Sequence, residues 1–198
     1  MERIALEHFI DFMLTVGPPK IAGVRECKDR RYDHLTDFYR PLRDAIVTMH
    51  EQGSATSSLD AFLATVQDER KARLFPALVA QYRSFLESQP MRWFAPPSAL
   101  LPVGDLEIEV KPELGVEIDG VPHVLMMHFR GERLARKRVN LIVGVLMSAL
   151  GSMRSDAVFG VLDVPQARVR ALKSAPNPKL GLLMRGEAAA FSTIYAAV

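Results

Sequence analysis

Apolar residues recur every three or four positions through the first half of the chain, which is the spacing of an amphipathic helix. These stripes predict helices over residues 3–16, 32–50 and 58–86. Gly17-Pro18-Pro19 should end the first helix, because proline cannot extend one. Pro41 and Pro76 fall inside the other two stripes and are expected to kink or split them.

After Leu100 the apolar residues alternate with polar ones or gather in short runs, which indicates β-strands. Asp119-Gly120 is a strong hairpin signal between two of these strands. The pattern predicts strands over residues 105–110, 114–118, 123–129, 158–164 and 167–172, with the first three forming a meander. A long helix is expected over 134–150, and another at the C-terminus.

This order of elements predicts a fold of the α/β (or α+β) class. We expect an N-terminal helical layer followed by a mixed β-sheet with the order α-β-β-β-α-β. A chain of 198 residues can bury a full hydrophobic core. We therefore predict a single domain over residues 1–198, with a mainly helical part at 1–98 and the mixed sheet at 99–198.

Composition excludes several classes of protein. With 48% apolar and 24% charged residues, the chain is unlike a disordered chain, a collagen or a disulfide scaffold. Its one cysteine, Cys27, cannot form an internal disulfide, which favours a cytoplasmic location. Glu2, Glu7 and Asp11 interrupt the apolar N-terminus, unlike a signal peptide. No apolar stretch reaches the roughly 18 residues of a membrane span, so no membrane partner is expected.

The charges are unevenly placed, although the formal net charge is only +2. Residues 101–120 hold six acids and one base, whereas residues 130–138 hold five bases and one acid. The five bases are Arg130, Arg133, Arg136, Lys137 and Arg138. A basic block at the start of a predicted helix favours nucleic-acid phosphates, because the helix N-terminus adds free N–H groups and a positive dipole end. The alternative is a solvated helix turn that pairs with the neighbouring acidic strands.

The sequence contains no motif typical of a cofactor site. The five histidines lack metal-ligand spacing, and His123 and His128 should point to opposite faces of one strand. There is no Walker A loop and no GxGxxG. We therefore predict no cofactor.

The order of elements over about residues 80–170 resembles the core of the PD-(D/E)xK nuclease superfamily (the restriction-endonuclease-like fold), especially its exonuclease-like branch. Lys111-Pro112-Glu113-Leu114 resembles the step that carries the first acid, Val116–Gly120 the hairpin turn and His123–Gly131 the third strand. The helix from Arg133 resembles the helix that follows that strand. In active members, the resemblance implies two carboxylates that hold Mg²⁺ and a lysine that orients or activates water.

The third strand departs from the family pattern. Aligning Gly131 with the glycine that often follows the family's lysine places Met127 at the acid and Phe129 at the lysine. Neither side chain can hold Mg²⁺ or activate water. The resemblance therefore implies a nuclease-like fold with a degenerate site.

Three functions remain open. The one we favour is a non-catalytic binding domain that contacts nucleic-acid phosphates through the basic block. The second is a Mg²⁺-dependent nuclease with relocated acids, which would require Glu113, Glu117 and Asp119 to converge with Glu87. The third is a protein-interaction module that uses the helical half, whose charges sum to zero.

Overall fold

The computed structural model of the chain describes residues 1–29, 37–88, 91–172 and 178–198. Helices account for 52% of the structure and strands for 22%, and the strands form two mixed sheets. The protein is therefore of the mixed helix-and-sheet class that the hydrophobic pattern predicts.

The larger sheet has five strands in the order β2-β5-β6-β7-β8. Its strands are β2 (Met91–Trp93), β5 (Leu114–Ile118), β6 (Val121–His128), β7 (Val158–Asp163) and β8 (Arg168–Ala171). β5 and β6 form the hairpin predicted at Asp119-Gly120, and both residues of its turn have positive φ. β6 and β7 are parallel, and helix α6 (Arg136–Leu150) connects them.

The smaller sheet has three strands in the order β1-β4-β3. Its strands are β1 (Glu2–Ala5), β3 (Ala99–Val103) and β4 (Leu106–Val110). β1 and β4 are parallel, although about a hundred residues separate them, and β3 pairs antiparallel with β4. Alternation along β4 buries Leu106, Ile108 and Val110 on one face, which is why the strand belongs at the core.

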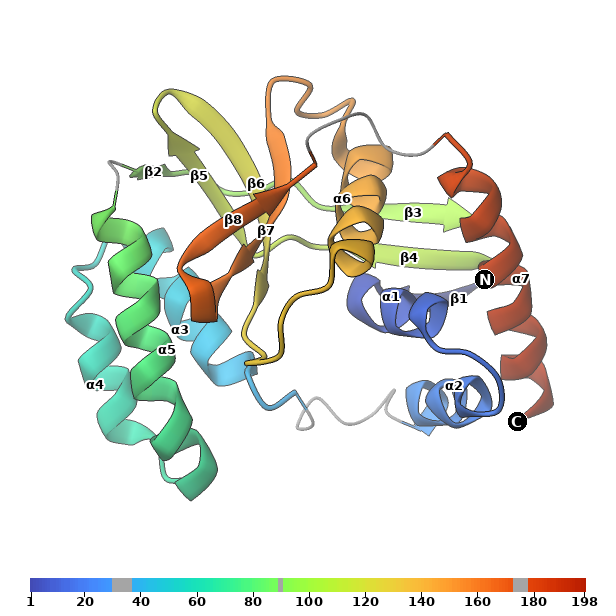
Figure 1. The fold of residues 1–198 in the computed structure, drawn as a ribbon, viewed down its shortest axis with the longest axis horizontal. Helices are drawn as coiled ribbons and strands as arrows, with labels where there is room; N and C mark the ends of the chain where they lie inside the picture. Colours follow the sequence, from blue (N-terminus) through green and yellow to red (C-terminus); the bar gives the residue numbers. More distant parts are fainter. Residues whose placement is uncertain (30–36, 89–90, 173–177) are drawn as a thin grey trace.

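The helices lie in two groups on opposite sides of the five-stranded sheet (Figure 1). One group consists of α3 (Arg40–Glu51), α4 (Ser58–Thr65) and α5 (Glu69–Glu87). The other consists of α1 (Leu6–Leu14), α2 (Pro19–Asp29), α6 and α7 (Leu180–Ala197), together with the smaller sheet. A short 3₁₀ turn, η2 (Val164–Gln166), joins β7 to β8 and packs on α5.

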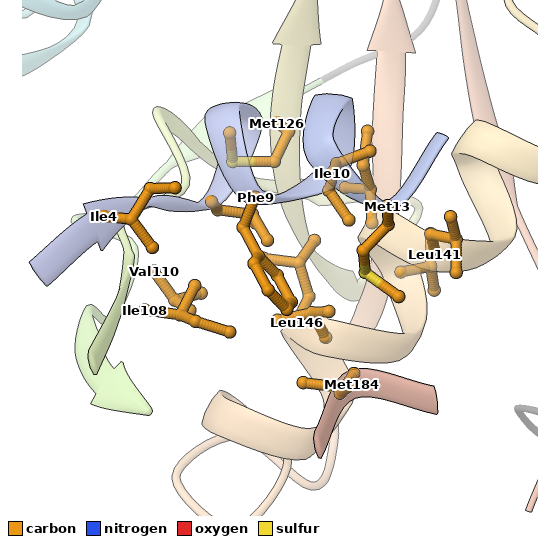
Figure 2. Close-up of a cluster of buried hydrophobic side chains, with 14 of the residues drawn as sticks. Ile4, Phe9, Ile10, Met13, Ile108, Val110, Met126, Leu141, Leu146 and Met184 are labelled. Atoms are coloured by element: carbon orange, nitrogen blue, oxygen red, sulfur yellow. The ribbon is translucent and has the colours of Figure 1, made fainter. Parts of the chain in front are cut away.

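Each side of the larger sheet buries its own hydrophobic core. Even-numbered β6 residues such as Val124 and Met126 face the first core, where Figure 2 shows Phe9 of α1 reaching toward Leu146 of α6. Odd-numbered residues such as Leu125 and Met127 face the second core, against α3 and α5. β6 is therefore buried on both faces, as its continuous apolar run predicts.

The N-terminal segment corrects one expectation. The stripe predicted as a helix over residues 3–16 begins as strand β1, and the helix starts only at Leu6. Pairing with β4 supplies hydrogen-bond partners for the backbone of residues 2–5. Because β4 is distant in sequence, no local pattern could indicate this pairing. The predicted meander is also wrong, because β4 pairs with β1 and β3 and not with β5.

The prolines act differently from the prediction. Pro41 lies in the first turn of α3, where proline is tolerated because its missing N–H has no helical partner. Residues 32–36 of that predicted helix fall outside the described residues. Pro76 lies within a continuous α5, and the chain breaks instead before Asp68, whose side chain accepts the backbone N–H of Lys71.

Candidate functional site

A charged cleft lies at the carboxyl ends of the parallel strands β6 and β7. These strands end at His128 and Asp163, which are paired in register. The cleft has a volume of about 900 Å³, within the range of ligand sites, and its position is where open α/β sheets commonly bind ligands. Its charged and titratable lining comprises Glu7, His8, Asp11, Asp37, Arg40, Arg43, His128, Arg130, Glu132 and Arg138.

Arg43 joins three acids at one side of the cleft. Its guanidinium hydrogen-bonds Asp37, lies 3.7 Å from Oε1 of Glu7, and brings Nε to 3.0 Å from Oε1 of Glu113. The acids come from the segment before α3, from α1 and from the start of β5. A single cation thus connects elements that pack in different cores.

Burial and charge shift the pKa values of this cluster. Burial raises the pKa of Glu113 to about 8; the nearby Glu7 carboxylate adds to this, whereas Arg43 opposes it. Burial also raises the pKa of Glu7. Burial alone would lower the pKa of Arg43, but the carboxylates of Glu113 and Glu7 and the hydrogen bond to Asp37 outweigh it and raise that pKa. The guanidinium therefore stays charged and serves as the counter-ion of the cluster.

Glu113 also has a backbone partner. Its Oε2 accepts the N–H of Met127 at 2.9 Å. The Met127 and Phe129 side chains are 2% and 3% exposed and pack in the second core. The guanidinium of Arg43 lies 5.7 Å from the Phe129 ring centroid.

A second set of charges lies near the Arg43 cluster, at Asp11 on α1 and around the ends of β6 and β7. Arg138 of α6 hydrogen-bonds Asp11 of α1. Asp163 is 2% exposed and lies 3.4 Å from Nη2 of Arg170. His128 stands beside Asp163, and its buried Nε2 has no hydrogen-bond partner among the described residues. Burial lowers the pKa of His128.

A smaller cavity of about 300 Å³ adjoins the cleft. His8, Asp11 and Arg130 line both spaces, so the two meet across α1. The smaller cavity continues between α1, α2 and α7, where Lys20 and Gly23 line it. We call these two neighbouring cavities, which share His8, Asp11 and Arg130, the α1 groove.

The structure places the predicted basic block at the edge of the cleft. Arg130 and Arg138 line the cleft, whereas Arg133, Arg136 and Lys137 are exposed just outside it. The last two lie in the first turn of α6, whose N-cap residue supplies no side-chain hydrogen bond. Arg138 pairs with Asp11, but within the described chain no ion pair involves the other four. We call Arg130, Arg133, Arg136 and Lys137 the basic rim.

The structure does not bring the candidate acids together. Glu113 lies in the Arg43 cluster, whereas Glu117 is 2.7 Å from Nη2 of Arg92 at the sheet edge. Asp119 is exposed in the β5–β6 turn, and Glu87 is exposed at the end of α5. Among the described residues, no group of three or more His, Cys, Asp or Glu side chains is arranged to hold a metal ion. This geometry gives the relocated-acid hypothesis no support.

The sequence analysis missed Arg43, Asp37 and the role of Glu7. Glu7 and Asp11 are four residues apart on the polar side of α1, so the helical spacing could have indicated a shared charged face. Arg43 neighbours the buried Leu42 on an ordinary amphipathic helix and carries no local signal. Its role depends on the contact with Glu113, which lies next to β5 and is distant from Arg43 in sequence.

Comparisons of the chain with protein-family models, with curated proteins and with solved structures find no match. Among the described residues, no helix has the length and apolar character needed to cross a membrane.

Proposed function

We propose that this protein is a non-catalytic binding domain with a nuclease-like core and that its basic rim contacts nucleic-acid phosphates. The observation that carries the proposal is the rim itself. Four cations within eight residues are exposed at the edge of a large cleft, without ion pairs in the described chain. Clustered cations that form no ion pair with the described residues attract a polyanion.

Two features of the surroundings support this function. The first turn of α6 contains three bases and no acid, so its N–H groups and positive dipole end add to the rim. In the same cleft, Arg43 already neutralises part of the charge of Glu7, Asp37 and Glu113. The acids near the cleft therefore repel a phosphate less than their number suggests.

The same cluster supports the non-catalytic part of the proposal. In the resemblance proposed here, Glu113 corresponds to the first acid of the nuclease family, and its oxygens contact Arg43 and the Met127 N–H. The side chains of Met127 and Phe129, where the second acid and the lysine would stand, are buried in the core. At these two aligned positions the chain therefore offers neither the second oxygen ligand nor the ammonium group on which the family's hydrolysis depends.

The test is binding of labelled nucleic acid by the triple variant R133A/R136A/K137A, measured by fluorescence anisotropy between about 50 and about 200 mM salt. Each lost phosphate contact should reduce the log–log salt slope by about 0.9. The matched control is R3A/R92A/R185A, which removes three exposed arginines of β1, β2 and α7 that do not line the cleft. Equal weakening by both variants, or no binding by the wild-type protein, would contradict the proposal.

A further inference from the structure

The α1 groove has features that the basic rim alone does not explain. It runs from the cleft of about 900 Å³ to the cavity of about 300 Å³, with His8, Asp11 and Arg130 at their junction. Arg130 belongs to both spaces and is exposed without an ion pair in the described chain. A ligand held by the rim at Arg130 would therefore adjoin both cavities.

We propose that the α1 groove binds a single strand of nucleic acid, with Arg130 at the midpoint of its path. This inference rests on the proposed function and specifies its ligand. A duplex presents a stiff, uniformly charged surface, whereas a single strand can bend and place individual bases in a groove. The charged rim beside the α1 groove therefore suits a single strand better than a duplex.

The lining of the larger cavity has the composition that single strands require. Phe38 and Tyr39 are half-buried and line it; one side of each ring packs on Phe75 or Phe129 of the second core, and the remaining exposed surface is what a base could contact. The charged lining is balanced, with four acids and four arginines. Glu7 and Asp37 are paired with Arg43, and Asp11 is paired with Arg138. Arg40 pairs with Asp44, and the acid Glu132 offsets Arg130 within the lining. The net attraction for phosphate therefore comes from Arg133, Arg136 and Lys137, which are exposed just outside the cleft.

The smaller cavity provides a way to block the groove without changing its charge. Gly23 of α2 lines this cavity, is exposed, and a Cβ built on it would meet nothing within 4 Å. Gly23→Trp should fill the smaller cavity while leaving the basic rim intact. Gly186→Trp is the matched control, because Gly186 is an exposed helical glycine of α7 that is equally open and lines neither cavity.

The experiment measures affinity for single strands of about 4 and about 16 nucleotides, the span of known site sizes, as DNA and as RNA, and for a duplex of the longer length. We expect the long single strand to bind at least about tenfold more tightly than the duplex. Gly23→Trp should lower the affinity for the long strand several-fold and leave the affinity for the short strand unchanged. Gly186→Trp should change neither affinity. Arg130→Ala should lower the affinity for both the long and the short strand.

The outcomes separate this inference from the proposed function. Equal affinity for the single strand and the duplex, or no effect of Gly23→Trp on binding of the long strand, would overturn this inference. Neither result would overturn the proposed function, which R133A/R136A/K137A tests separately. An unchanged salt slope and affinity in R133A/R136A/K137A would overturn both. Competition by an acidic peptide as strong as that by the oligonucleotide would indicate a protein ligand and would also overturn the inference. A preference between the DNA and RNA arms would identify the sugar that the groove accepts.

Discussion

The Nε atom of Arg43 lies 3.0 Å from Oε1 of Glu113, so a cation of helix α3 is paired with an acid at the start of β5. The same guanidinium reaches Glu7 on α1. The contact therefore ties the second core, which contains α3, to the first core, which contains α1. It also decides what Glu113 can do, because the carboxyl group is occupied within the protein.

Removing this cation should be costly. Arg43→Ala removes the shared partner of Glu113, which is 13% exposed, and of Glu7 and Asp37, which are 45% and 39% exposed. Because the cluster is only partly buried, we expect a cost of about 1–3 kcal/mol. Urea denaturation measures the change in the free energy of unfolding. Arg3→Ala is the control, because Arg3 is 55% exposed in its pair with Glu107 and such a pair contributes about 0–1 kcal/mol. Similar losses for both variants would show that Arg43 is not the structural counter-ion.

Glu113 should make stability depend on pH. Its pKa is raised from 4.5 to about 8, so the folded state retains a proton that the unfolded state releases between these values. The free energy of unfolding contributed by this group therefore falls as pH rises through that window. Glu113→Gln keeps an oxygen for the Met127 N–H but cannot titrate, so this fall should disappear. Denaturation curves at several pH values test the prediction, and parallel pH profiles for the two proteins would refute it.

His50 should have the opposite dependence. Its Nε2 hydrogen-bonds the buried Tyr82 hydroxyl, and burial lowers the pKa of His50 below 6.5. The unfolded state then binds more protons, so stability is lost as pH falls from about 6.5 toward the folded-state pKa. His50→Gln retains a partner for Tyr82 and should reduce this acid sensitivity. Thermal unfolding at acid pH measures the effect, while the value at pH 8 serves as the reference. An unchanged acid sensitivity would count against this role for His50.

Gly115 should not tolerate a side chain. A Cβ there would lie 2.3 Å from the carbonyl oxygen of Phe94 and 2.8 Å from its ring. Because the Phe94 N–H donates to the Gly115 carbonyl, β5 cannot shift away without losing that bond. Gly115→Ala should cost about 1–3 kcal/mol, by overpacking. Gly23→Ala, in an open part of helix α2, should instead gain about 0.5–1 kcal/mol. The two denaturation midpoints should therefore move in opposite directions.

Local patterns in the sequence determined most of the strands of the larger sheet and helix α6. The strands β5, β6 and β7 lie within one or two residues of the ranges predicted from apolar runs and from Asp119-Gly120. Periodicity works there because burial of a strand or helix face imposes its own repeat on the residues. The basic block was also visible, since its charges are contiguous along the chain.

Tertiary structure alone decided which of these elements meet. β1 is a strand because β4 lies beside it, and Glu113 is a buried acid because Arg43 and Met127 surround it. The cleft and its acids depend on contacts between α1, α3 and β5, which are far apart in sequence. A local sequence pattern shows which face of its own helix or strand a residue occupies. The pairing of distant elements depends instead on backbone hydrogen bonds and packing that no local repeat encodes.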